Sequence, residues 1–214
     1  MFPLAPEGYS FVLIPALAGV VAWLFGYHWV AVPCWLVMLA CVAFFRDPAR
    51  ESDAPPEAVL APADGKVLSV GNAPEGLIAI GLPKQVSIFM SPTDVHVNRA
   101  PIAGKVREAR WSPGRKFPAF RDKASALNEH SFVVVEGELG TVAFKQIAGA
   151  VARRVVCRLE AGQQVTRGQR VGIIKFGSRV DVFLPADSTV EVTPGKRARA
   201  GITTIARLVR VSQE

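Results

Sequence analysis

Residues 11–45 contain no Asp, Glu, Lys or Arg, and this uncharged block constrains the fold more than any other feature. Two apolar runs, 11–25 and 30–45, are separated by the tetrapeptide Gly-Tyr-His-Trp. Each run is shorter than the ~20 residues of a full membrane span, and together they are too long for one upright helix. The pattern favours a helical hairpin, with a single tilted span and a re-entrant pair as alternatives. A buried core helix would not contain so many uncharged residues, and a cleaved signal peptide would begin with basic residues.

The aromatic residues of this block are candidate anchors at the membrane surface, since Trp and Tyr concentrate there: Trp23, Tyr27, Trp29 and Trp35. His28 is interpreted as an interfacial polar residue rather than a ligand. Arg46 and Arg50 follow the block directly, so the positive-inside rule places the rest of the chain on the cytoplasmic side of a cell membrane. We therefore expect a membrane anchor at 1–45, a Pro-rich charged linker at 46–56 and a separate domain at 57–214.

Charge is confined to the remainder of the chain. All 25 Lys and Arg residues lie beyond residue 45 with 17 of the 18 Asp and Glu residues, which gives that part a net charge of +8. A basic body behind an apolar block suits an anionic membrane surface, and no signature of a nucleic-acid-binding motif is present, so no nucleic-acid partner is expected. Cys34, Cys41 and Cys157 form no C-x-x-C pair, which argues against a zinc site or a disulfide framework and suits a reducing compartment.

Short Val- and Ile-rich runs alternate with Gly and Pro after residue 57, which is typical of many short β-strands. The predicted strands are 66–70, 77–81, 86–90, 132–136, 141–148, 154–159, 170–175, 180–184, 189–193 and 203–211. An internal echo accompanies them: A-P-A-D-G-K-V at 61–67 recurs as A-P-I-A-G-K-V at 100–106, and two Gly pairs share a spacing of six. Such echoes are familiar from barrel-sandwich folds such as the lipoyl and biotinyl carriers, although no exposed carrier lysine occurs at a hairpin tip. The fold class is therefore predicted to be mainly β, with a barrel-sandwich-like body behind an N-terminal α-helical membrane hairpin.

The stretch K-F-G-S-R-V-D-V-F-L-P, residues 175–185, places a nucleophile beside a small residue. Gly177 can take backbone conformations that are closed to other residues, so the Gly177–Ser178 peptide can sit in a strained turn. Such a turn can aim the Ser178 hydroxyl back at the Gly177 carbonyl. The alternation of Val180, Val182 and Leu184 predicts a half-buried strand after it. Taken alone, the pair is most simply explained as a serine in a strand-entry turn.

Six blocks occur in one order along the chain: F-F-R-D-P (44–48), A-P-A-D-G-K-V (61–67), F-M-S-P-T-D-V-H-V-N-R-A-P (89–101), N-E-H (128–130), I-A-G-A-V-A-R-R-V-V (147–156) and F-G-S-R-V-D-V-F-L-P (176–185). This ordered set resembles the short form of the phosphatidylserine decarboxylases. The resemblance implies a pyruvoyl-dependent enzyme that converts phosphatidylserine to phosphatidylethanolamine. It also implies a proenzyme that cleaves itself between Gly177 and Ser178, so that a large chain, 1–177, stays paired with a small chain, 178–214.

The resemblance also implies the chemistry. Attack by Ser178 on the Gly177 carbonyl gives an ester, elimination gives dehydroalanine, and hydrolysis leaves a covalent pyruvoyl group. This group forms a Schiff base with the substrate amine and accepts the electrons released with CO2, so neither a metal nor pyridoxal phosphate is expected. His96 lies in the family-like motif D-V-H-V-N-R and is the best candidate for transferring protons. Asp64 is the implied orienting carboxylate, and Asp94 is a second candidate acid.

Two positions depart from the family pattern. Long-form relatives use a second histidine, three places after the first, as the base for cleavage, whereas this chain has Arg99, whose guanidinium is a poor base. Either His96 performs both proton transfers or the base lies elsewhere, and Arg99 then suits a substrate carboxylate or phosphate. His130 stands where relatives usually have arginine, as a spare base or only a loop residue.

Residues 111–123 interleave aromatic with basic side chains: Trp111, Phe117 and Phe120 with Arg115, Lys116, Arg121 and Lys123. This pattern predicts either a loop that touches lipid or a solvated surface loop, with Phe117 and Arg115 as candidate substrate-binding residues. The expected partners are a phospholipid substrate in the membrane and further copies of the chain. Two other functions stay open: a membrane-tethered, non-enzymatic barrel-sandwich adaptor, and a serine hydrolase that uses Ser178 but lacks G-x-S-x-G.

Overall fold

The protein is described by a computed structural model that covers residues 3–115, 117, 125, 127–149, 154–175 and 178–209. The chain divides into two compact units, Met1–Ala49 and Arg50–Glu214. The first contains the short helix η1 (Pro6–Gly8), α1 (Tyr9–Leu24) and α2 (His28–Phe44). The second contains α3 (Glu75–Ile78) and the strands β1 (Ala58–Leu60), β2 (Gly65–Asn72), β3 (Lys84–Met90), β4 (Val97–Arg99), β5 (Gly104–Ser112), β6 (His130–Gly137), β7 (Gly140–Ala148), β8 (Val155–Cys157), β9 (Gln164–Val165), β10 (Arg170–Ile174), β11 (Ser178–Leu184), β12 (Thr189–Val190), β13 (Arg197–Ala198) and β14 (Thr204–Arg207).

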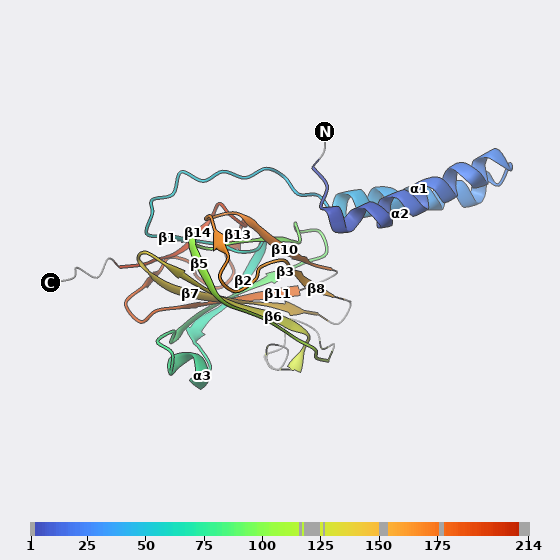
Figure 1. Cartoon of the computed structure of the whole chain (residues 1–214). Helices are drawn as coiled ribbons and strands as arrows, with labels where there is room; N and C mark the ends of the chain where they lie inside the picture. The colour runs from blue at the N-terminus through green and yellow to red at the C-terminus, as the bar shows by residue number, and fades with distance from the viewer. Residues whose placement is uncertain are drawn as a thin grey trace. The chain divides into compact units, whose positions relative to one another are not determined.

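The first unit is a helical hairpin, as its two apolar runs predict (Figure 1). Gly26, with φ of 80°, turns the chain between α1 and α2. The helices pack closely, since a Cβ atom on Gly19 would lie 2.4 Å from the indole nitrogen of Trp35. Close approach of two helices through a small residue is common in membranes, where association relies on packing. The segment Pro6–Leu24 is 19 residues long and apolar enough to cross a membrane, whereas α2 is shorter.

The second unit is mainly β, in agreement with the predicted fold class. Its largest sheet has eight strands in the order β13-β2-β3-β11-β7-β6-β5-β9, and two three-stranded sheets have the orders β1-β14-β12 and β4-β10-β8. The predicted strand 77–81 is wrong, because Glu75–Ile78 form a helical turn between β2 and β3. Ile78 and Ile80 remain exposed there, so the apolar run does not reflect a buried strand face.

Strand β11 lies in the middle of the eight-stranded sheet, paired with β3 on one side and β7 on the other. All seven of its residues are buried, so the prediction of a half-buried strand is wrong. Val180 and Val182 face the main core, while Arg179 and Asp181 occupy the other face as a buried ion pair with an Nε–Oδ1 distance of 2.5 Å. Arg179 and Asp181 can stay buried because they pair with each other. The alternation of charged and apolar residues along β11 therefore did not indicate an exposed face.

The internal echo corresponds to a structural repeat. Gly65 and Gly104 have nearly the same φ, 150° and 153°, and each begins a strand that pairs with a two-residue strand, β13 or β9. Each copy accepts an equivalent backbone hydrogen bond. The Gly201 amide donates to the Ala61 carbonyl at 2.8 Å, and the Gly168 amide donates to the Ala100 carbonyl at 2.9 Å. The repeated sequence therefore forms two equivalent turns in the body, and Asp64 lies in the first of them.

Candidate active site

Ser178 is the first residue of β11 and is fully buried. It pairs with Met90 on β3 and with Ala148 on β7. Alternate residues of a strand share a face, so Ser178 lies on the same inward face as Val180. Its hydroxyl donates to the sulfur of Met90 at 3.1 Å, and a thioether is a weak acceptor. The hydroxyl is thus enclosed in the body without a strong hydrogen-bond acceptor among the contacts that the structure describes for it.

The chain changes sheets immediately before Ser178. Strand β10 ends at Ile174 in the sheet β4-β10-β8, and β11 begins four residues later in the eight-stranded sheet. The amide of Ile174 donates to the carbonyl of His96 at 3.3 Å, and the amide of Lys175 donates to that of Arg154 at 3.2 Å. The fold therefore holds the entry to the predicted cleavage segment beside His96. Gly177, the other predicted cleavage-site residue, lies outside the described residues.

His96 is fully buried just before β4, and its ring is oriented by a main-chain group. The Nδ1 atom lies 2.9 Å from the carbonyl oxygen of Asp94. A carbonyl only accepts hydrogen bonds, so this contact assigns the ring proton to Nδ1 in the neutral tautomer. The lone pair is then on Nε2, which is the form of histidine that a general base requires.

Asp64 is oriented by contacts that the sequence did not predict. Its Oδ1 accepts from Arg50 Nη1 at 2.6 Å and from the Ala200 amide at 2.7 Å, and its Oδ2 accepts from Arg50 Nη2 at 2.8 Å. These contacts form a bidentate ion pair in which the side chains of Arg50 and Asp64 are only 7% and 14% exposed. The His96 ring instead donates its orienting hydrogen bond to the main-chain carbonyl of Asp94, the second candidate acid.

The carboxylate of Asp94 is itself held in place. Its Oδ2 accepts from the Ser91 amide at 2.9 Å, and its Oδ1 pairs with Arg197 of β13. The side chain therefore fixes the turn whose main chain orients His96. Asp94 thus contacts the His96 ring through its main-chain carbonyl, while its carboxylate contacts Ser91 and Arg197.

Arg99 ends β4 close to the first repeat. Its amide donates to the Pro62 carbonyl at 2.9 Å, two residues before Asp64. Its Nη1 donates to the Gly168 carbonyl at 3.1 Å, and its Cδ would lie 2.9 Å from a Cβ added to Gly201. The glycine at 201 thus makes room for the arginine side chain. The fold consequently brings Asp64 and Arg99 to one region of the body.

Two buried amide side chains near Ser178 were not predicted as site residues. Asn98 Oδ1 accepts from Gln146 Nε2 at 2.7 Å, and Asn98 Nδ2 lies 3.7 Å from the Met90 sulfur that Ser178 also contacts. Both side chains are fully buried. Asn98 belongs to one of the six blocks. Gln146 alternates on β7 with the core residues Val142, Phe144 and Ala148, and a polar residue in that alternation was the available signal.

His130 lies on the other face of the eight-stranded sheet. It pairs with Ile147, which pairs with the outward-facing Arg179. Burial lowers the pKa of His130, although its hydrogen bond to the Asn128 carbonyl at 2.8 Å acts in the opposite direction. The lowered pKa favours the neutral ring, but alternation along the strands separates His130 from the Ser178 hydroxyl. This arrangement favours a structural role for His130 over that of a spare base.

The predicted lipid-contacting loop connects to the Ser178 strand through Asn128. The carboxamide of Asn128 accepts from the Phe117 amide at 2.9 Å and donates to the carbonyls of Phe117 and Ala148 at 2.7 and 2.6 Å. Ala148 is the residue paired with Ser178. Arg115 is exposed and its amide donates to the Leu127 carbonyl at 2.7 Å. Lys116, Phe120, Arg121 and Lys123 lie outside the described residues.

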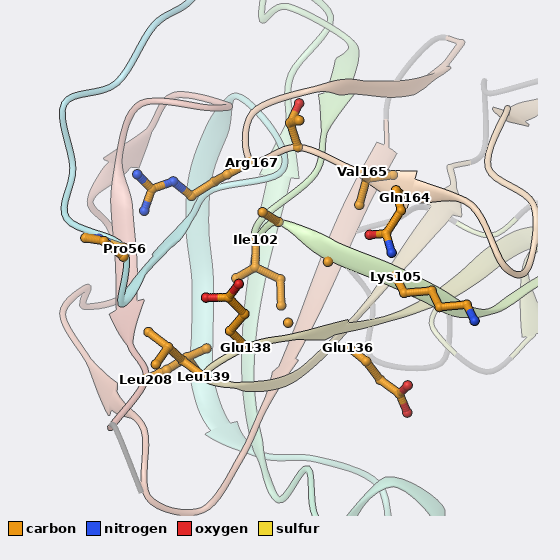
Figure 2. Close-up of a pocket in the computed structure, with 14 residues that line it drawn as sticks. Pro56, Ile102, Lys105, Glu136, Glu138, Leu139, Gln164, Val165, Arg167 and Leu208 are labelled. Atoms are coloured by element: carbon orange, nitrogen blue, oxygen red, sulfur yellow. The ribbon is translucent and has the colours of Figure 1, made fainter. Parts of the chain in front are cut away.

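A cavity of 740 Å³ lies at the opposite end of β7, around its turn to β6 (Figure 2). Its lining includes Ile102–Lys105, from the second copy of the internal repeat, and Gln164–Arg167, which begin with the strand β9 that pairs with this copy. Ala103 occupies the place that Asp64 has in the first copy. Among the described residues, the predicted site residues do not line this cavity. Only the first copy, 61–67, therefore has a carboxylate at this position, and the candidate site residue Asp64 lies in that copy.

Comparison with known proteins identifies the family. The profile of the phosphatidylserine decarboxylase family matches residues 37–206. A phosphatidylserine decarboxylase proenzyme of Magnetococcus marinus is 44% identical over 209 residues, which cover 95% of this chain and 94% of the relative. Proenzymes of the same name from Solibacter usitatus and Burkholderia cenocepacia are 47% and 42% identical, over 93% and 96% of both chains respectively. The chain belongs to the phosphatidylserine decarboxylase family, a family of carboxy-lyases.

Proposed function

We propose that this chain is a proenzyme that cleaves itself between Gly177 and Ser178 and then decarboxylates phosphatidylserine to phosphatidylethanolamine. The observation that carries the proposal is the placement of Ser178 as the buried first residue of the central strand β11. Four residues earlier, the Ile174 amide donates a hydrogen bond to the His96 carbonyl. Membership of the family supports the reaction, and the relatives' name, proenzyme, supports processing.

In the proposed maturation, the Ser178 oxygen attacks the carbonyl carbon of Gly177 and the peptide C–N bond breaks, which leaves an ester. His96 takes the hydroxyl proton through Nε2, because its Nδ1 holds a proton against the Asp94 carbonyl. Loss of the proton on Cα of residue 178 then expels the Gly177 carboxylate and leaves dehydroalanine. Water replaces the nitrogen, and ammonia departs, so that residue 178 ends as a pyruvoyl group.

The surroundings of Ser178 fit this group. A pyruvoyl group has no more heavy atoms than the seryl residue that it replaces, so the enclosed space beside Met90 and Ala148 would hold it. The group supplies an acceptor for the electron pair that is released when the substrate carboxylate leaves as CO2. In this proposal His96 would return a proton to the substrate carbon, and Arg99 would supply a cation for the substrate's carboxylate or phosphate.

The strand order supports a stable two-chain product. The small chain, 178–214, would carry β11–β14, and the large chain, 1–177, would carry the other strands. Strand β11 pairs with β3 and β7, β13 pairs with β2, and β14 pairs with β1. Hydrogen bonds in two sheets would therefore join the chains after cleavage.

The substrate lies in a membrane, and the uncharged hairpin is proposed to keep the enzyme there, with the basic body on the cytoplasmic side. The apolar helix Pro6–Leu24 and the position of Arg46 and Arg50 after the hairpin support this arrangement. Trp111, which is 56% exposed, is proposed to contact lipid together with Phe117 and Arg115.

The test is the intact mass of the purified protein beside CO2 release from phosphatidylserine vesicles. We expect a 37-residue fragment, 178–214, with a blocked N-terminus. Ser178→Ala should leave one inactive chain, and Ser69→Ala on an exposed position of β2 should behave as the parent. An uncut chain with an unmodified Ser178 would overturn the proposal. Hydrolysis of an ester by that chain would then favour a serine hydrolase, and the absence of activity would favour an adaptor.

A further inference from the structure

The first arginines after the uncharged block differ in what they contact. Arg46 Nη1 donates to the carbonyl of Ala43, within the first unit. Arg50 is the first residue of the second unit, and its guanidinium binds Asp64 and the carbonyl of Ala200. The sequence accounts for both residues by membrane orientation alone. The contacts of Arg50 indicate a second role inside the body.

The geometry restricts how Asp64 can act. A carboxylate has about four acceptor positions on its two oxygens. Arg50 Nη1 and the Ala200 amide take two positions on Oδ1, and Arg50 Nη2 takes one on Oδ2. One position therefore remains, on Oδ2, and its direction is set by the planar fork of the guanidinium.

The ion pair is also enclosed. The two side chains are 7% and 14% exposed, so removal of the arginine would leave the carboxylate buried without its countercharge. The Ala200 amide could hold Oδ1 at 2.7 Å, but it does not contact Oδ2. Without Arg50, rotation of the carboxylate would no longer be restrained at the oxygen that remains available to a proton donor.

We propose that Arg50 is a positioning residue for maturation, which fixes the Asp64 carboxylate so that Oδ2 is presented to the group that activates Ser178. This inference rests on the proposed function and adds to it the role of orienting carboxylate that the family resemblance implies for Asp64. It gives the irregular segment that precedes β1 a part in holding the Asp64 carboxylate.

The experiment compares full-length variants by the rate at which the fragment 178–214 appears and by CO2 release per cleaved molecule. Arg50→Ala should slow cleavage by about 10²-fold or more, in the range for loss of positioned acid–base catalysis, with Asp64→Asn similarly impaired. Arg50→Lys should be intermediate, because a lysine keeps the charge and loses the bidentate fork. Millimolar guanidinium should restore cleavage of Arg50→Ala and leave Asp64→Asn unchanged.

Two matched controls separate this role from a simple tether. Arg167 donates to the carbonyls of Ala54, Pro55 and Ala58, so Arg167→Ala loosens the same segment without touching Asp64. Arg46→Ala removes a charge from the same region. Both should cleave at the parental rate.

The outcomes distinguish the inference from the proposed function. If Asp64→Asn stays uncut while Arg50→Ala and Arg50→Lys mature at the parental rate, the role of Arg50 is overturned and that of Asp64 stands. If Asp64→Asn matures normally, the proposed role of Asp64 fails first. If Arg50→Ala does not fold, Arg50→Lys decides, and its maturation at the parental rate overturns the inference. If Arg167→Ala is as slow as Arg50→Ala, the arginine only holds the segment in place.

Discussion

The hairpin exposes its large apolar side chains, whereas the β-rich body buries them. Leu24 and Leu36 of the hairpin are 77% and 61% exposed, whereas Phe144 and Val182 of the body are fully buried. A helix satisfies its backbone hydrogen bonds within itself, so it can present apolar side chains to lipid. The body must instead hide its apolar residues between sheets. An apolar run therefore identifies a surface in one region and a core in the other.

Removal of the hairpin should give the largest effect, because it changes where the protein is found. Deletion of residues 1–45 should move the protein into the soluble fraction after a high-salt wash, while self-cleavage continues in the body. The measurement is the distribution of protein and fragment after centrifugation. A truncated protein that stays on the membrane in high salt would show that the basic body or residues 111–123 carry the attachment.

The proposed chemistry should depend on the body and not on the hairpin. His96→Ala should reduce the rate of self-cleavage by about 10²–10⁴-fold, since positioned proton-transfer groups contribute that much. His28→Ala, at the start of α2, is the control and should mature normally. The measurement is the cleaved fraction over time. If His96→Ala matures at the parental rate, the base is another residue, and His130→Ala is the next variant to measure.

The contrast in burial predicts different stabilities for equivalent truncations. Phe144→Ala should lower the free energy of unfolding of the body by about 3–5 kcal/mol, because it removes a buried ring and leaves a cavity. Leu36→Ala in the hairpin should leave that free energy unchanged. Chemical denaturation followed by circular dichroism measures both. Equal losses in the two variants would contradict the comparison.

The smallest effect concerns acid stability of the body. Burial lowers the pKa of His130 below its ordinary value of 6.5, so the unfolded chain binds the proton more readily than the folded one. Stability should therefore be present above pH 6.5 and decline as the pH falls below it. His130→Gln should flatten this part of the curve, as measured by the melting temperature between neutral and mildly acidic pH. An unchanged slope would assign the acid sensitivity to other groups.

Local patterns predicted those parts of the fold that depend on neighbours in the sequence. The absence of charge in residues 11–45 predicted the hairpin, and the repeat of 61–67 at 100–106 corresponds to two equivalent turns. The same patterns failed at 77–81, where the apolar run forms a helical turn with exposed side chains. They also failed for Arg179 and Asp181, whose mutual pairing allows a charged face to be buried.

The sequence alone determined which residues are able to carry the proposed chemistry, because nucleophile, imidazole and carboxylate are properties of Ser178, His96 and Asp64 themselves. Only the tertiary structure decided what holds each of them. Arg50, in a segment without regular structure, binds Asp64, and the Asp94 carbonyl orients His96. Alternation along the paired strands places His130 on the face of the sheet opposite Ser178. These contacts depend on strand register and on contacts between segments that are far apart in the sequence. The local spacing of residues predicts neither of them.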